Sequence, residues 1–99
     1  MKYAIRYTAA AFEDFERLYD YLIAKDIELA ERALEAIQKA VELLGDFPFT
    51  CRKASADNAF LRELVIPFGS SGHVALFEIE NDTTVTVLAV RHQREEDYH

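Results

Sequence analysis

The sequence predicts a two-layer α+β domain in which two antiparallel helices cover one face of an antiparallel sheet. Apolar residues recur at three- and four-residue spacing over positions 9–25 and again over 26–45, as in amphipathic helices. From position 61 they alternate with polar residues, as in strands, and a short alternating segment precedes the first helix. We therefore expect a strand, a two-helix hairpin and a three-stranded antiparallel meander, with the first strand joining the sheet beside the last.

The first strand and first helix follow from residues 2–25. Tyr3, Ile5 and Tyr7 alternate with more polar or smaller neighbours, which predicts a half-buried strand over Lys2–Tyr7. Thr8 is a typical N-cap residue and is followed by good helix formers. The residues expected on the buried face of the helix over 9–25 are Phe12, Phe15, Leu18, Tyr19, Leu22 and Ile23.

A second helix is predicted to begin after Asp26, whose side chain can cap it. Gly45 is expected to end this helix in a left-handed conformation, with Pro48 three residues beyond. The apolar seam is too short for a stable coiled coil, so an intramolecular core is its expected use. That seam consists of Ile27, Ala30, Leu34, Ile37, Val41 and Leu44.

The second half of the chain predicts a meander. Residues 46–60 contain turn formers and no regular pattern, so we expect them to be irregular. Residues 68–72 and 80–82 are predicted turns, and 93–99 form a polar, acidic tail. The three predicted strands are Leu61–Pro67, His73–Ile79 and Thr83–Arg91.

Length and charge limit the functional classes. A chain of 99 residues is predicted to form one domain over 1–99, and a core this small should gain stability from a partner. The net charge of −7 opposes a main role in gripping nucleic-acid phosphates. The acids concentrate in the predicted helices, whereas the bases Arg6, Arg52, Lys53, Arg62, Arg91 and Arg94 lie on the strands and the loop before them.

Cysteine usage and hydropathy predict a cytoplasmic protein without cofactor. Cys51 is the only cysteine, so neither an internal disulfide nor a cysteine zinc site is expected, and no metal site is predicted. The segment MKYAIRYTAAAF has no signal-peptide pattern, and no stretch approaches the about 20 apolar residues of a membrane span. Cys51 itself is interpreted as an incidental loop thiol, because no histidine lies near it in sequence.

Several segments resemble the ParE/RelE toxin superfamily, whose members include plasmid stabilisation proteins, and among these the ParE-type toxins most closely. The segments are Leu61-Arg62-Glu63-Leu64, Ile66-Pro67-Phe68-Gly69, the run from Val87 to Glu95 (VLAVRHQRE), the helix with Asp14, Leu18 and Tyr21-Leu22, and Ala30-Glu31-Arg32. The resemblance covers essentially the whole chain. It implies a RelE-like fold and the toxin half of a bacterial type II toxin–antitoxin system.

The resemblance also implies partners. A cognate ParD-like antitoxin would bind the toxin in a hetero-oligomer and silence it. ParE-type members inhibit DNA gyrase by binding, whereas RelE-type relatives on the same fold cleave mRNA on the ribosome, and the fold alone cannot choose between them. We take the gyrase inhibitor as the leading hypothesis, with neither direct nucleic-acid binding nor membrane association expected. The alternatives are a ribosome-dependent mRNA endonuclease and a degenerate homologue that only binds its antitoxin.

The candidate site residues differ between these hypotheses. A gyrase-binding surface would use Arg62, Arg91, His92 and Arg94, and Arg91 and Arg94 are expected to be exposed at a strand end. A nuclease would need Glu63 and His92 as base and acid, with Arg62 near the phosphate. Because side chains alternate along a strand, Arg62 and Glu63 should face opposite sides of the sheet, as should Arg91 and His92.

These residues also have structural interpretations. Arg62 could form a cross-strand ion pair with Glu78. His92 could be a strand-end histidine bonded to backbone, and Arg91 and Arg94 could balance the acidic tail.

Overall fold

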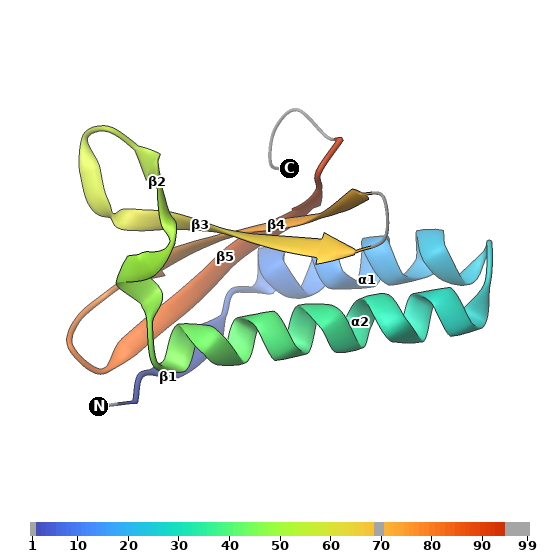
Figure 1. Ribbon diagram of the computed structural model, residues 1–99, viewed down its shortest axis with the longest axis horizontal. Helices are drawn as coiled ribbons and strands as arrows, with labels where there is room; N and C mark the ends of the chain where they lie inside the picture. The colour runs from blue at the N-terminus through green and yellow to red at the C-terminus, as the bar shows by residue number, and fades with distance from the viewer. Residues whose placement is uncertain (1, 69–70, 95–99) are drawn as a thin grey trace.

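The two helices lie side by side on one face of a twisted sheet in the computed structural model, which describes residues 2–68 and 71–94 (Figure 1). Helix α1 spans Ala9–Ile23 and helix α2 spans Ile27–Glu42. Thr8 and Asp26 cap them as predicted, because their side chains accept hydrogen bonds from the N–H groups of Ala11 (3.1 Å) and Glu28 (2.9 Å). None of the helices among the described residues is long and apolar enough to cross a membrane.

The sheet has five strands in the order β1-β5-β4-β3-β2. Strand β1 pairs with β5 in parallel, so the first strand joins the last as predicted, and the other pairs are antiparallel. The α+β class and the two-layer arrangement are therefore confirmed. The bounds are Ala4–Tyr7 for β1, Arg52–Ser55 for β2, Asn58–Phe68 for β3, Ser71–Ile79 for β4 and Thr84–His92 for β5.

Strand β2 corrects the prediction that residues 46–60 are irregular. This segment contains a 3-10 turn, η2 (Pro48–Thr50), then β2 and the start of β3. Strand β2 has no apolar alternation of its own, and it forms because Arg52 and Lys53 pair across the ladder with Glu63 and Arg62. Pairing with a long neighbouring strand, rather than local propensity, produces this element.

Gly45 has a different role from the predicted one. Helix α2 ends earlier and continues into a 3-10 turn, η1 (Leu43–Gly45), in which Gly45 is buried and is not left-handed. The carbonyl of Gly45 accepts a hydrogen bond of 2.6 Å from the N–H of Tyr3. A Cβ atom at position 45 would lie 3.2 Å from Cε of Lys2 and 3.5 Å from the carbonyl oxygen of Tyr3, so the N-terminal segment packs closely against Gly45.

The core lies between the helices and the sheet. Helix α2 presents most of its predicted seam to it, but Ile27 is 55% exposed. Helix α1 is rotated from the prediction: Phe12 is 59% exposed, while Asp14 is buried. The buried core residues are Ala11, Leu18, Ile37, Val41, Leu44, Ile66, Ala75, Phe77, Ile79, Val85, Val87 and Val90.

Candidate target-binding site

Three charged residues meet on the sheet face that the helices leave open. Glu63 alternates with Leu64, which packs on the core, so the carboxylate of Glu63 points to the opposite face. Arg52 pairs opposite Glu63 on β2, and Nε of Arg52 lies 3.0 Å from Oε1 of Glu63. From β5, a guanidinium nitrogen of Arg91 lies 4.0 Å from Oε2 of Glu63. We call Arg52, Glu63 and Arg91 the Arg–Glu–Arg cluster.

Arg91 lies inside this cluster rather than at the surface. Its side chain is 14% exposed and that of Glu63 is 16% exposed, against 55% for Arg52. Arg91 also donates to the carbonyls of His92 and Gln93, each at 3.4 Å, which fixes the end of β5. The predicted exposure is therefore wrong for Arg91 and correct for Arg94, which is exposed.

His92 lies on the other face of β5 from Arg91, as alternation predicts. Its ring packs edge-on against the buried His73 ring, with centroids 5.6 Å apart. The Nδ1 atom of His92 accepts a hydrogen bond of 3.1 Å from the backbone N–H of Arg94. This contact agrees with the interpretation of His92 as a strand-end histidine bonded to backbone, and it orders the backbone that carries Arg94.

Arg62 points away from the Arg–Glu–Arg cluster and does not pair with Glu78, which is in register with Leu61 instead. Its guanidinium donates to three backbone carbonyls, those of Ala59 (2.7 Å), Cys51 (2.8 Å) and Phe49 (3.2 Å). It also lies 5.4 Å from the ring centroid of Phe49. Arg62 thus holds η2 against the start of β3, and the predicted ion pair with Glu78 is wrong.

The residues proposed for a nuclease are therefore spread over the sheet. Arg62 is in register with Phe77 and His92 with His73, so four residues of β4, about 13 Å, separate their positions. Glu63 faces the other side of the sheet from both. Within the described ranges 2–68 and 71–94, no group of His, Cys, Asp and Glu is placed to hold a metal ion.

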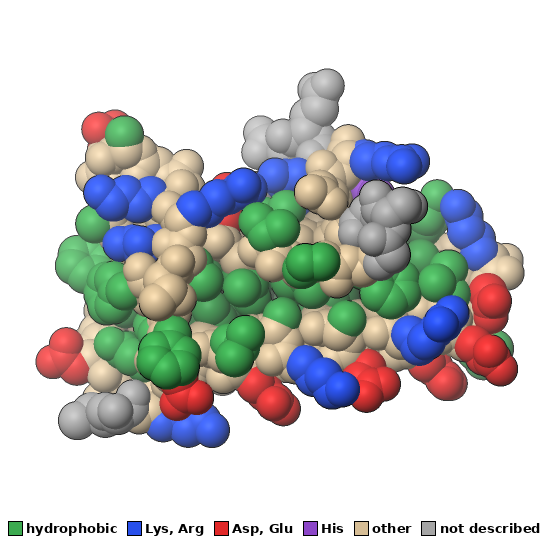
Figure 2. All heavy atoms as spheres, in the orientation of Figure 1, with side chains coloured by type: hydrophobic (Ala, Val, Ile, Leu, Met, Phe, Trp, Pro, Cys, Tyr) green, Lys and Arg blue, Asp and Glu red, His purple; other side chains and the backbone are tan. Residues whose placement is uncertain are grey.

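The sequence did not single out Arg52, because β2 was not expected. Its place beside Glu63 depends on a strand that local pattern does not predict. Figure 2 shows several basic side chains over the β2–β3 end of the molecule, while most acidic side chains lie along the helix edge with basic ones between them. The polar tail that was predicted over 93–99 lies largely outside the described residues.

Two helices on one face of a mixed five-stranded sheet define the class of fold as a two-layer α+β domain. Residues 5–97 match the family described as the ParE toxin of the type II toxin-antitoxin system parDE. The chain belongs to the ParE toxin family.

A solved structure supports the fold. A chain from the "Chromosomal ParDE TA system from P. aeruginosa" superposes with a TM-score of 0.74 at 17% sequence identity. The match covers 92% of this chain and 96% of that one. A search of curated proteins by sequence finds no match.

Proposed function

We propose that the chain is the toxin of a type II toxin–antitoxin pair, that a cognate antitoxin neutralises it, and that it inhibits DNA gyrase by binding. Membership of the ParE toxin family supports the first two parts. The choice of binding over RNA cleavage is carried by one observation, the separation of Arg62, Glu63 and His92 described above. A general base, a general acid and a phosphate-stabilising cation must converge on one phosphate, and these three residues do not.

The contact surface in this proposal is the end of β5. Arg94 is exposed and offers a guanidinium to the target. Arg91 and His92 hold the backbone that carries Arg94. Arg91 donates to the carbonyls of His92 and Gln93, and Nδ1 of His92 accepts from the N–H of Arg94. Arg62 is assigned a structural role away from this surface.

The deciding experiment adds the purified chain to gyrase supercoiling relaxed plasmid, and in parallel to ribosomes translating a labelled mRNA. We expect supercoiling to be inhibited and the mRNA to remain intact. Ribosome-dependent cleavage with normal supercoiling would instead make the chain a RelE-type nuclease. If neither activity changes while the antitoxin still binds, the chain is a homologue that has kept only antitoxin binding.

The contact surface is tested with Arg94→Ala against a matched control, Arg32→Ala, on the exposed side of α2. Both variants remove one exposed guanidinium, so both should unfold within about 0.5 kcal/mol of the parent chain. We expect Arg94→Ala to inhibit gyrase at least tenfold less well and Arg32→Ala to be unchanged. If the two variants inhibit gyrase equally well, the end of β5 is not the surface that contacts gyrase.

A further inference from the structure

An exposed tyrosine and an exposed lysine lie together at the C-terminal end of α1. Tyr21 is on the last turns of the helix and is 58% exposed. Lys25 follows the helix and is also exposed, and its Nζ atom lies 4.6 Å from the centre of the Tyr21 ring. A lysine ammonium at this distance from an aromatic ring makes a cation–π contact, so the two side chains form one feature of the surface.

This end of α1 lies beside the end of β5, because the helix and the strand run in the same direction. The Thr8 hydroxyl, at the start of the helix, donates to the carbonyl of Leu88. One and a half turns later the Asp14 carboxylate accepts from the N–H of Val90, two residues further along β5. Continuing along both elements leads to Tyr21 on the helix and to Arg94 after the strand.

Arg94 lies within electrostatic reach of the Tyr21 ring. Tyr21 comes after Asp14 by about 10 Å of helix. Arg94 comes after Val90 by at most about 13 Å of extended chain. A hydrogen bond with Lys25, the charge of Lys25 and, least of these, the charge of Arg94 lower the pKa of the Tyr21 hydroxyl. Tyr21, Lys25 and Arg94 therefore belong to one surface, which we call the Tyr–Lys–Arg surface.

The acids of α1 lie on another side of the helix. At about 100° per residue, its exposed acids are about 80–140° around the helix axis from Tyr21. These acids are Glu13, Glu16 and Asp20. Asp14 lies nearer to Tyr21, but its carboxylate binds the backbone of β5 and the guanidinium of Arg17. Among the described residues, the charges that act on the Tyr21 hydroxyl are positive, although the chain as a whole carries −7.

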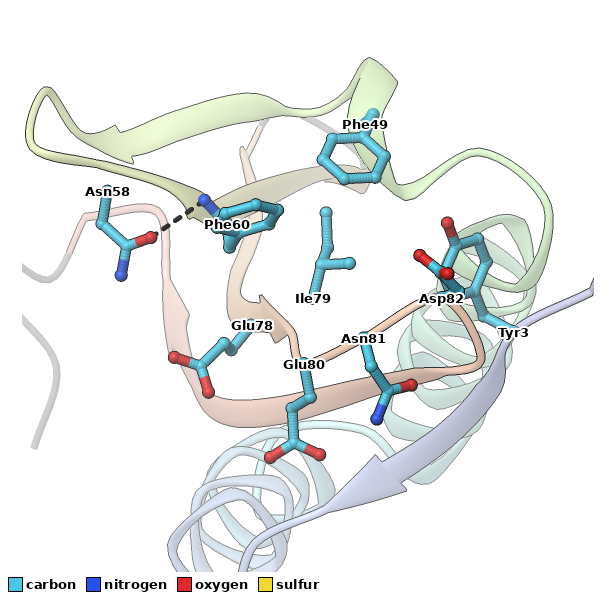
Figure 3. Close-up of a pocket in the computed structure, with 9 residues that line it drawn as sticks. All are labelled: Tyr3, Phe49, Asn58, Phe60, Glu78, Ile79, Glu80, Asn81 and Asp82. Atoms are coloured by element: carbon cyan, nitrogen blue, oxygen red, sulfur yellow. Dashed lines mark hydrogen bonds between the residues drawn. The ribbon is translucent and has the colours of Figure 1, made fainter.

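A hollow of about 620 Å³ at the turn between β4 and β5 is a surface of another kind, at the other end of β5 from Arg94 (Figure 3). Phe49, Phe60 and Ile79 lie around its centre, and the carboxylates of Glu78 and Glu80 point away from them. None of the described residues that line it is a lysine or an arginine. An acidic ligand finds no opposite charge there, so the hollow provides a reference region for binding experiments.

We infer that the Tyr–Lys–Arg surface binds an acidic segment of the target protein, with carboxylates on Lys25 and Arg94 and an apolar side chain on the Tyr21 ring. Carboxylates form charge-assisted hydrogen bonds with both cations. A nucleic acid could also meet these two cations, but its long phosphate backbone would approach the acids on the outer side of α1. The inference rests on the proposed function in taking Arg94 as a target contact, and it adds the chemistry of the partner.

The first test measures peptide binding in the absence of gyrase. The ¹⁵N-labelled full-length chain is titrated with acetyl-Ala-Glu-Leu-Glu-Ala-amide and with the same peptide carrying glutamine in place of both glutamates. We expect the acidic peptide to shift the amide resonances of Tyr21, Lys25 and Arg94 and to leave those of Phe60 and Ile79, in the hollow, unchanged. It should bind at least fivefold more tightly than the glutamine peptide. Equal binding of the two peptides, or shifts centred on another surface, would overturn the inference.

Variants separate this inference from the proposed function. Lys25→Gln should weaken both the acidic peptide and the inhibition of gyrase at least threefold. The control Lys39→Gln removes a lysine of α2 whose side chain is 73% exposed, and it should change neither. If Arg94→Ala weakens gyrase inhibition and Lys25→Gln does not, the proposed function stands and the inference fails. If the chain does not inhibit gyrase but binds the acidic peptide at this surface, gyrase is not the target and the acidic segment belongs to another protein.

Two other occupants are tested in the same titration. A single-stranded oligothymidylate that shifts the same resonances more strongly than the acidic peptide would make the surface a nucleic-acid site. Glu95, Glu96 and Asp97 follow Arg94 directly in the sequence. An acidic peptide that binds only after these three acids are replaced by their amides would mean that the chain's own tail is the ligand. Either result would overturn the inference.

Discussion

Arg62 and Arg91 are both strand arginines that follow an apolar residue, yet they bind different partners. Alternation along the strand predicted that Arg62 and Glu63 would face opposite sides, and the contacts agree. It could not predict the partners of Arg62, because the carbonyls of Phe49 and Cys51 belong to a segment without a readable pattern. Nor could it predict that the Arg91 side chain is only 14% exposed and lies beside Glu63, a residue distant in sequence.

Replacement of Glu63 should destabilise the chain. In Glu63→Gln the two guanidiniums of the Arg–Glu–Arg cluster lose their shared negative charge, and Arg91 is only 14% exposed. We expect the free energy of unfolding in urea to fall by about 1–3 kcal/mol. The control Glu35→Gln breaks an ion pair with Lys39 whose side chains are 63% and 73% exposed, and should change it by less than about 0.5 kcal/mol. Equal effects would mean that the cluster adds no stability.

Cys51 should react slowly with alkylating reagents in the folded chain. Burial raises the pKa of its thiol, and the nearby Arg62 guanidinium offsets this only in part. A raised pKa leaves less thiolate at any pH below it, and thiolate is the reactive form. The pH at which the iodoacetamide reaction reaches half its maximal rate should therefore be higher for the folded chain than for the chain in urea. The reverse order would contradict the burial of this thiol.

At the scale of elements, side chains at the start of α1 form hydrogen bonds with the backbone of β5 beyond the point where β5 stops pairing with β1. The ladder between β1 and β5 ends at Tyr7 and Val87. Beyond it, the Thr8 hydroxyl donates to the carbonyl of Leu88 (2.9 Å), and Oδ2 of Asp14 accepts from the N–H of Val90 (2.9 Å). Arg17 lies 3.5 Å from Asp14 and supports this carboxylate. Side chains of a helix thus satisfy backbone groups of a strand.

The sequence could not reveal this role of Asp14. An aspartate near the start of an acidic helix is typical of a solvated surface residue, and nothing local distinguishes Asp14 from its neighbour Glu13. The same limit explains β2, whose residues are polar and acquire their conformation only from β3. In contrast, α2, β4 and β5 could be predicted from the sequence, because the spacing of apolar residues within each element shows which of its residues are buried.

Asp14→Ala should loosen α1 from β5. The buried N–H of Val90 would lose its acceptor, so we expect a cost of about 1–3 kcal/mol in unfolding free energy. Hydrogen exchange at the Val90 amide should become about five- to 150-fold faster, as about 1.4 kcal/mol corresponds to a factor of ten. Glu13→Ala, at the exposed neighbouring position, is the control and should leave this amide unchanged. Unchanged protection in Asp14→Ala would show that the carboxylate is not needed here.

At the scale of the whole molecule, much apolar surface remains uncovered. Among residues 2–68 and 71–94, ten large hydrophobic residues are at least 36% exposed, including Phe12 and Phe47 at 59% and 61%. They lie on β1, on both helices, on η1, on η2 and the residue before it, and on β3, so no single small patch contains them. A small core combined with this much exposed apolar surface leaves room for a partner to contribute stability.

The cognate antitoxin should therefore stabilise the chain strongly. Binding to the folded state alone at a thousandfold excess over Kd adds about 4 kcal/mol. For a domain of this length we expect the midpoint of thermal unfolding to rise by about 15 °C or more. Differential scanning calorimetry with and without saturating antitoxin measures this shift, with an unrelated protein of equal concentration as the control. An unchanged midpoint would contradict neutralisation by tight binding to the folded toxin.

The parallel pairing of β1 with β5 has a consequence for how the chain is made. A ribosome releases β1 and both helices first, but the partner of β1 is Thr84–Val87, which is translated after both helices and strands β2 to β4. Val85, Val87 and Val90, which complete the core, lie on the same strand, β5. Until then the seams of α1 and α2 have no complete sheet to cover them. The core of the nascent chain is therefore completed only after β5 has left the ribosome.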